Sequence, residues 1–166
     1  MEELSQSFRN YFLNSEESAA KEYQSIVSRL AKTISEQVQS QSLPYCGKSP
    51  SELSTQLSTV DFFPEEGTDI SLVLEKTKEI LIGSNISVYH PHCVAHLHCP
   101  SLIVSLAAEM IIAAFNQSMD SWDQAPAATM IEKALCQKLC AFSGFGKEAD
   151  AVFTGGGTMS NFMGLL

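Results

Sequence analysis

Apolar side chains recur along the chain at spacings that predict a series of helices. The clearest stripe repeats every three or four residues and comprises Ala20, Tyr23, Val27, Leu30 and Ile34. This spacing places the stripe on one face of an otherwise polar helix, which Ser15 can cap. Little apolar sequence lies nearby to cover the stripe, so another subunit is a candidate partner. A shorter helical pattern precedes it at Leu4, Phe8, Tyr11 and Phe12.

The middle of the chain alternates between irregular and helical patterns. Residues 41–59 are rich in Ser, Pro and Gly and are predicted to form a loop. A helix is predicted over residues 70–81, with Thr68 as its cap and Gly83 as its stop. Residues 86–100 are aromatic, rich in histidine and interrupted by proline, so they are predicted to be irregular.

The last third of the chain predicts further helices and one short strand. Residues 101–115 are apolar almost all round, which predicts a helix that is buried on most sides. Pro126 suits the first turn of the next helix, and Gly144 ends it. Residues 151–153 are β-prone and are bounded by glycines. A helical pattern resumes at Thr158 and is still running at the last residue, so we expect a truncated chain.

Composition and charge narrow the class of protein. The 166 residues suffice for one domain with a sizeable core, and 45% hydrophobic with 17% charged residues is a globular balance. The formal charge of -9 argues against binding to nucleic acid or to an anionic membrane. The five cysteines are odd in number and include no C-x-x-C pair, and no secretory signal is visible. We therefore expect free thiols and a cytoplasmic location.

A glycine-rich run is the strongest chemical signal in the sequence. The run is Thr154-Gly155-Gly156-Gly157-Thr158-Met159-Ser160-Asn161, between the predicted strand and the last helix. Glycines let backbone N–H groups converge on a phosphate, and the hydroxyls of Thr158 and Ser160 can add donors. The run fits neither the Walker pattern nor the dinucleotide fingerprint. A flexible turn between strand and helix is the alternative.

A second signal is a cluster of histidines. All four histidines of the chain lie within residues 90–98, together with Cys93 and followed by Cys99. Structural zinc sites pair ligands from two separated clusters, whereas here every potential ligand lies in one stretch. We therefore predict no metal site. A structural loop and a loop that faces a substrate both remain open.

Three segments in this order resemble the group II pyridoxal-phosphate-dependent amino-acid decarboxylases. They are the histidine-rich run, the polar run at residues 116–124 that leads through Pro126 to Glu132, and the glycine-rich run. The resemblance covers about residues 62 to 166 and is loose before them. Within the family, the first two runs look most like those of bacterial L-2,4-diaminobutyrate decarboxylases. They are also similar to those of lysine-type decarboxylases of siderophore pathways.

The resemblance implies a cofactor site and a substrate site. The family's Ser-Gly-Gly-Thr loop matches residues 155–158, so Gly156, Gly157 and Thr158 are expected to hold the phosphate of pyridoxal 5'-phosphate. Gly155 departs from the usual serine, and Met159 stands where glutamine is common. The histidine-rich run matches the segment that lines the substrate pocket in relatives. His96, with His98 behind it, is therefore expected to contact the amino-acid substrate.

The resemblance also implies the fold class and the domains. We expect an α/β protein of the fold-type I transferase class, with residues 1–85 as a helical dimerisation segment. Residues 86–166 are then the start of the large domain that binds the cofactor, which this chain leaves incomplete. In the family the leading helices clasp the neighbouring subunit, so a homodimer is expected. Polyamine or siderophore biosynthesis is the implied setting.

No catalytic residue is assigned, because the lysine that carries the cofactor lies downstream of the glycine loop in the family. None of the lysines present lies in such a context, so the 166-residue chain alone is expected to be inactive. L-2,4-diaminobutyrate is the expected substrate, with lysine, glutamate and aspartate as alternatives. A truncated, non-catalytic interaction module and another enzyme of the same fold type, such as an aminotransferase, are the rival interpretations.

Overall fold

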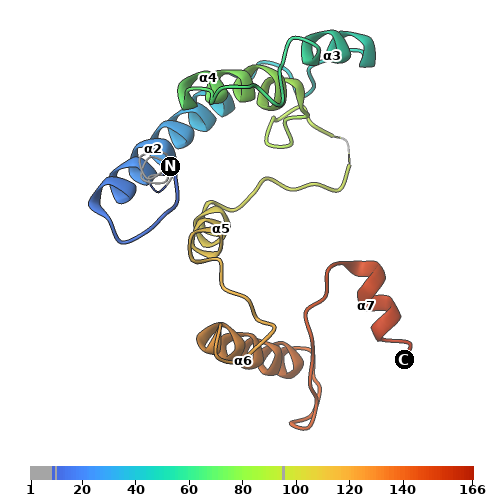
Figure 1. Ribbon diagram of the computed structural model, residues 1–166. Helices are drawn as coiled ribbons and strands as arrows, with labels where there is room; N and C mark the ends of the chain where they lie inside the picture. The colour runs from blue at the N-terminus through green and yellow to red at the C-terminus, as the bar shows by residue number, and fades with distance from the viewer. Residues whose placement is uncertain (1–8, 10, 95) are drawn as a thin grey trace. The chain divides into compact units, whose positions relative to one another are not determined.

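The computed structural model describes residue 9 and residues 11–94 and 96–166. The pattern predicted at Leu4 and Phe8 lies outside these residues. The chain forms two compact units, Met1–Leu106 and Ala107–Leu166 (Figure 1). The boundary predicted between residues 85 and 86 stays a prediction.

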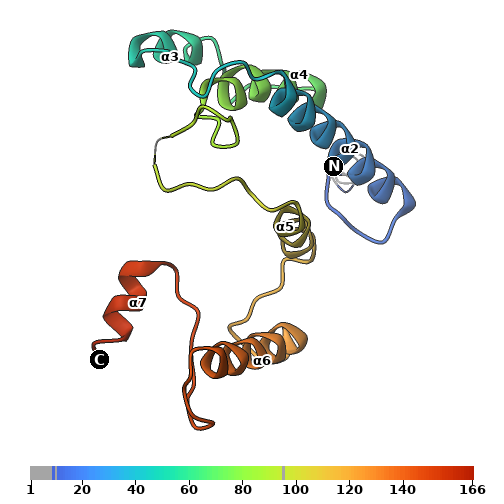
Figure 2. The ribbon, with the colours of Figure 1, turned by 180° about the vertical axis from the view of Figure 1, so that it is seen from behind.

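The apolar stripe near the amino terminus forms one long helix that packs on its own chain. Helix α2 (Glu17–Ser40) has Ala19 buried, with Tyr23, Val27 and Leu30 half-buried. It contacts the turns that follow α4, and it lies beside them in both views of the ribbon (Figure 2). Ile34 remains exposed, so the covered face is rotated slightly from the predicted stripe. The stripe therefore does not depend on another subunit for all of its cover.

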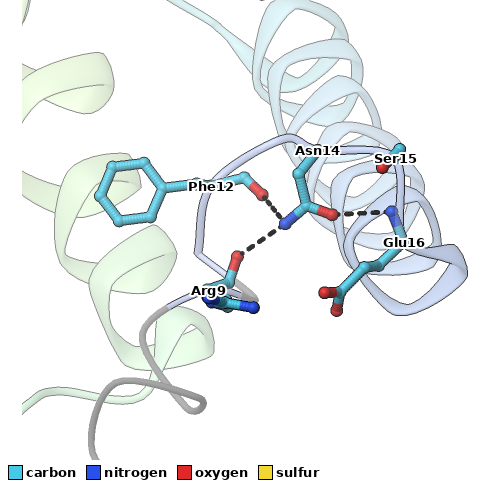
Figure 3. A pocket seen from close by; sticks show the side chains of 5 residues that line it. All are labelled: Arg9, Phe12, Asn14, Ser15 and Glu16. Carbon is cyan, nitrogen blue, oxygen red and sulfur yellow. Dashed lines mark hydrogen bonds between the residues drawn. The ribbon is translucent and has the colours of Figure 1, made fainter.

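The start of α2 is fixed by Asn14, and the predicted cap at Ser15 is wrong. The Asn14 Oδ1 atom accepts a hydrogen bond of 2.7 Å from the amide of Glu16. Its Nδ2 atom donates to the carbonyls of Arg9 and Phe12, each at 3.0 Å (Figure 3). The N-cap position is Glu16, without a capping bond from its side chain. The amide of asparagine donates and accepts at once, which a serine hydroxyl cannot do over this span.

Residues 41–59 contain a helix where the sequence predicted only a loop. Helix α3 (Pro50–Leu57) starts with a capping box, in which Ser49 accepts from the Glu52 amide and Glu52 accepts from the Ser49 amide. Proline occupies its first turn, where its missing N–H costs nothing. Composition misled the prediction, because a Ser-Pro start with glutamate three residues later is a helix signal. The helix packs against the turn after α4.

The helix predicted over residues 70–81 is present but changes geometry along its length. Helix α4 (Ile70–Lys76) continues into a π-helical turn (Thr77–Leu81) and a 3₁₀ turn (Ile82–Ser84). Asp69 caps it by accepting from the Ser71 amide at 2.8 Å, so the predicted cap at Thr68 is wrong by one residue. The helical run ends at Ser84, one residue after the predicted stop.

Helix α5 (Ile103–Phe115) forms as predicted but is not buried. Among the described residues, nothing covers Val104, Ile111 and Phe115, which are 74%, 62% and 72% exposed. Asn116 ends the helix with a φ of 44°, a left-handed conformation that asparagine tolerates. An apolar composition predicts burial only when neighbouring elements exist to supply it. The sizeable core expected from the length is likewise missing, since no large side chain is fully buried in the described part.

The last two helices match their predicted positions. Helix α6 (Pro126–Phe142) has proline in its first turn and ends before Gly144, whose φ of 82° closes the helix. Ala125, Cys136 and Cys140 are buried along it. Helix α7 (Gly157–Met163) follows the glycine run. Residues 151–153 stay irregular, because in the described residues no second strand offers them a ladder.

The described residues are mostly helical, as predicted for the amino-terminal part of this fold class, and they include no strand. None of the helices in the described ranges combines the length and the apolar character needed to cross a membrane.

Candidate functional site

The glycine-rich run forms an exposed bend that leads directly into α7. Gly156 has a φ of 152° and a ψ of 172°, a region of backbone space that only glycine occupies at low cost. Gly155 and Gly157 have no such φ, and a Cβ added at either would meet nothing within 4 Å. Within this chain, therefore, only Gly156 is required by backbone conformation. The other two glycines leave open space in front of the bend.

Two hydroxyl groups hold the bend together, and sequence reasoning missed one of them. The Oγ1 atom of Thr154 lies 2.6 Å from Oγ of Ser160 and donates to the Gly156 carbonyl at 3.1 Å. The Ser160 Oγ atom lies 3.2 Å from the same carbonyl, so its single proton is directed either to that carbonyl or to Thr154. Ser160 is thus engaged within the loop, although its sequence position suggested a phosphate donor. A Thr-x-Gly turn signal at residues 154–156 could have identified Thr154.

The backbone and hydroxyl hydrogen-bond donors that have no acceptor at this bend fit a phosphate group. The N–H groups of Gly157, Thr158 and Met159 occupy the first turn of α7, and in the described structure they have no acceptor. The Thr158 hydroxyl likewise has no partner there. Together with Gly155, Gly156 and Phe162, these residues line an exposed hollow of about 520 Å³. The lining contains no carboxylate to repel an anion, so the residues present fit the phosphate of pyridoxal phosphate.

The histidine-rich run is ordered by short-range turns at its start and is exposed at its end. The His90 amide donates to the Ser87 carbonyl and the Cys93 amide to the His90 carbonyl, both at 2.9 Å. The Nδ1 atom of His90 accepts from the His92 amide at 3.1 Å. The rings of His90 and His92 lie 5.5 Å apart. The first half of the run is therefore a structured turn that follows the end of the helical segment at Ser84.

The structure brings His96 and His98 together. Their ring centroids are 5.8 Å apart with the planes tilted by 50°, and both side chains are exposed. His96 has a φ of 67°, a left-handed conformation that costs a non-glycine residue about 1 kcal/mol or more. Two adjacent imidazoles can offer both donors and acceptors to a polar ligand. Across residues 11–94 and 96–166, no group of three or more His, Cys, Asp or Glu is placed to hold a metal ion.

The polar run before α6 is a loop with its own local bonds. The Ser118 hydroxyl donates to Asp120 at 2.8 Å, and the Ser121 hydroxyl donates to Asp123 at 2.7 Å. Ala125 occupies the N-cap position of α6 without a side-chain bond. Farther along α6, burial raises the pKa of the Cys136 thiol, and the nearby Glu132 and Asp150 raise it further. Cys136 is thus a packed thiol rather than an activated nucleophile.

Comparison with known proteins assigns most of the chain to one family. Residues 50–166 match the pyridoxal-dependent decarboxylase conserved domain. The L-2,4-diaminobutyrate decarboxylase of Acinetobacter baumannii is 40% identical over 146 residues, which are 87% of this chain and 28% of that protein. The enzyme of the same name from Rhizobium meliloti (strain 1021) is 40% identical over 121 residues, 73% of this chain and 24% of that protein.

The fold is also similar to a solved structure. The glutamate decarboxylase domain of diaminobutyrate-pyruvate transaminase and L-2,4-diaminobutyrate decarboxylase from Vibrio parahaemolyticus matches with a TM-score of 0.90 and 35% identity. The match covers 97% of this chain and 35% of that one, so this chain spans about a third or less of its relatives' length. Both the glycine-rich and the histidine-rich runs fall inside the matched range. The chain belongs to the pyridoxal-dependent decarboxylase family.

Proposed function

We propose that the protein acts in the decarboxylation of an amino acid with pyridoxal phosphate as cofactor, and that the amino acid is L-2,4-diaminobutyrate. The observation that carries the proposal is the 40% identity to a diaminobutyrate decarboxylase over 87% of this chain. Lysine, glutamate and aspartate are alternative substrates. Because the chain spans 28% of that relative, it contributes one part of the active site.

We assign the cofactor phosphate to Gly156, Gly157 and Thr158. The support is geometric, because the unpaired N–H groups and the Thr158 hydroxyl belong to residues that line an open hollow. Thr154 and Ser160 would keep the bend in shape while their own hydroxyls bond to each other. Met159, at the usual glutamine position, supplies a backbone donor but no side-chain donor.

We assign substrate contact to His96 and His98. Their rings form an exposed pair that can accept hydrogen bonds from the amino groups of a diamine or donate to a carboxylate. When bound, pyridoxal phosphate supplies the electron sink for the carbon–carbon bond that breaks. The residues of this chain bind and orient the reactants: the glycine-rich run would hold the cofactor phosphate, and the histidine pair would contact the substrate.

The activity is tested with the full-length enzyme, cofactor and separate amino acids, by measuring released carbon dioxide and the amine product. We expect 1,3-diaminopropane from L-2,4-diaminobutyrate at a rate at least about tenfold above that for lysine, glutamate or aspartate. Carbon dioxide from none of the amino acids would overturn the proposal. A preference for lysine, glutamate or aspartate would replace the substrate and keep the reaction.

The phosphate site is tested separately on the 166-residue chain by equilibrium dialysis. Pyridoxal phosphate is expected to bind more tightly than pyridoxal, which lacks the phosphate. Gly156→Ala should weaken this preference about tenfold or more, because an alanine Cβ opposes the observed φ. Gly146→Ala is the matched control, since its Cβ would meet nothing within 4 Å and Gly146 does not line the hollow. Equal binding of the two compounds to the unchanged chain would contradict the assignment.

We further propose a homodimer in the cytoplasm, with residues 1–85 as the dimerisation segment and residues 86–166 as the start of the large domain. The exposed Ile34 and Val38 on α2, 42% and 41% exposed, support an additional contact along that helix. The cysteines, five in number and without a C-x-x-C pair, support a reducing compartment. Polyamine or siderophore biosynthesis follows as the setting if diaminobutyrate is the substrate.

A further inference from the structure

Hydrogen bonds from two separate helical segments of the first unit converge on one half-buried lysine. The Lys48 Nζ atom donates to Gln56 Oε1 at 2.8 Å and to Ser84 Oγ at 3.1 Å. These bonds join a loop, helix α3 and the 3₁₀ turn that ends the helical run, and the Lys48–Ser84 bond spans 36 positions of sequence. We call this group, with Cys46 and Glu79, the lysine bracket.

Neighbouring contacts extend the lysine bracket on both sides. The Cys46 thiol donates to the Ser84 carbonyl at 3.0 Å. The Gln56 amide that accepts from Lys48 also donates to Glu79 Oε1, in the π-helical turn, at 3.4 Å. Lys48 therefore donates to two neutral oxygens. Its link to the Glu79 carboxylate is indirect, because Gln56 bonds to both side chains. Bonds from a charged donor to neutral acceptors are stronger than bonds between neutral groups.

The bracket lies immediately before the histidine-rich run. Ser87 is 5% exposed, and its amide donates to the Pro44 carbonyl at 2.7 Å. Ser87 in turn accepts from the His90 amide, and His90 accepts from the Cys93 amide. The loop that carries Lys48 is thus tied to the segment that leads into the His90 turn at three points, Lys48–Ser84, Cys46–Ser84 and Pro44–Ser87. Beyond Cys93 the described residues of the run are exposed, so the attachment lies at its base.

We propose that Lys48 is a positioning residue that fixes the base of the histidine-rich run. Its ammonium group holds the loop at residues 44–48 against Ser84, which keeps the Pro44 carbonyl in place for Ser87 and so orients the turn at His90. The anchoring stands on the contacts alone. Its consequence for substrate binding by His96 and His98 rests on the proposed function.

The anchoring is tested by amide hydrogen exchange on the protein and its Lys48→Met variant, which keeps an apolar stem but removes the donors. The amides of Ser87, His90 and Cys93 should exchange about tenfold faster or more, whereas those of Val27 and Leu30 in α2 should not change. Lys48→Arg should restore protection. Lys32→Met is the matched control, because Lys32 is an exposed lysine whose side chain, among the described residues, pairs with Glu36 alone.

Two results would overturn the proposal. One is wild-type exchange at Ser87, His90 and Cys93 in Lys48→Met. The other is an equal acceleration in α2, which would show general destabilisation. If Lys48→Met does not fold, Ser84→Ala removes one acceptor and leaves the Gln56 bond. It should accelerate exchange at the same three amides by a smaller factor, and unchanged rates would again refute the role.

In the full-length enzyme, loss of this anchor should raise KM about tenfold while kcat changes less than about twofold. This split is expected because the residues that the bracket orients are assigned to substrate contact. A fall in kcat at unchanged KM would contradict the substrate part of the inference. If the full-length enzyme without any substitution releases no carbon dioxide, the proposed function is refuted. The exchange experiment would still decide the role of Lys48.

Discussion

Single residues adopt conformations here that their sequence context does not reveal. Gly156 and His96 both have positive φ, but only glycine adopts its conformation without strain. Both lie in the two runs assigned to ligand binding, where such strain is concentrated in proteins generally. At Cys136 the surroundings act in the other direction. They raise the pKa of the thiol, which lowers the reactivity of a residue type that is often reactive. Residue type alone therefore predicts neither strain nor reactivity.

At the residue scale, we expect Cys136 to react slowly with alkylating agents. Burial and two nearby carboxylates raise the pKa of its thiol, so less thiolate is present at mild alkaline pH. Iodoacetamide at pH 8 should modify the exposed Cys99 at least about tenfold faster than Cys136. Mass spectrometry of peptides at successive times measures both rates. Equal rates would mean that α6 does not keep Cys136 covered in solution.

Two helix starts in this protein are fixed by side chains one position away from the caps that the sequence predicted. Asn14, Ser49 and Asp69 each bond to a backbone amide at or near the first turn of a helix. The predicted caps at Ser15 and Thr68 are displaced because a neighbouring amide or carboxylate is a better acceptor. The apolar pattern defines the middle of each helix, and the caps set its first residue.

At the element scale, Asn14→Ala should destabilise the start of α2 more than Ser15→Ala. The asparagine change removes three hydrogen bonds and is expected to cost about 1 kcal/mol of unfolding free energy. The serine change should cost less than about 0.5 kcal/mol, because in the described residues its side chain makes no capping bond. Urea denaturation of the two variants gives the comparison. A larger loss for Ser15→Ala would restore the original cap assignment.

A second prediction at this scale concerns pH and the capping box of α3. The Ser49 hydroxyl and amide lower the pKa of Glu52, so the folded state favours the ionised carboxyl. This contribution is present at neutral pH and is lost as pH falls below about 4, through the lowered folded pKa. Glu52→Gln should therefore reduce stability at pH 7 and have no effect at low pH.

Unfolding of Glu52→Gln is measured from pH 7 downward beside Glu22→Gln. Glu22 is a suitable control because it is an exposed carboxylate on α2, and the described residues give it no bonded partner. If the deficit of Glu52→Gln persists undiminished at low pH, the capping carboxylate is not its source. A matching deficit in Glu22→Gln would point to net charge instead.

On the scale of the whole molecule, the apolar faces of two helices, α5 and α6, are largely uncovered by other described residues. The described residues of α5 are almost all exposed, and α6 exposes Ile131, Leu135 and Phe142 by 66%, 45% and 90%. Contiguous apolar surface of this kind marks an interaction site or an aggregation risk. The chain is similar to a much longer solved chain, with a TM-score of 0.90 over 97% of its own length.

We therefore expect the 166-residue chain by itself to bind a hydrophobic dye and to self-associate. Replacing Ile111 and Phe115 with lysine should lower dye fluorescence at least about twofold and shift the chain toward monomer. Gln24→Lys combined with Gln39→Lys, both at exposed positions on α2, controls for the two added charges. Light scattering and dye titration give the two readouts. A chain that is monomeric without bound dye would show that the apolar faces are covered in solution.

The glycine-rich and histidine-rich runs could be identified from the sequence because their chemistry is local. Three consecutive glycines before a helix, and four histidines in one stretch, need no tertiary information to stand out. What could not be predicted was which hydroxyls are free. Thr154 and Ser160 bond to each other across six positions, which leaves Thr158 as the available side-chain donor. Such a choice depends on three-dimensional geometry.

By itself, the sequence determined the positions of α2, α5, α6 and α7, because each has a hydrophobic period or a proline or glycine boundary that acts over a few residues. Only the tertiary structure decided which faces are covered and which polar groups meet. The stripe of α2 packs on turns some fifty residues later, and Lys48 bonds to Ser84 across a gap of 36. Hydrophobic periodicity shows which face of a helix favours burial. Which segment covers that face depends on how the chain folds back on itself.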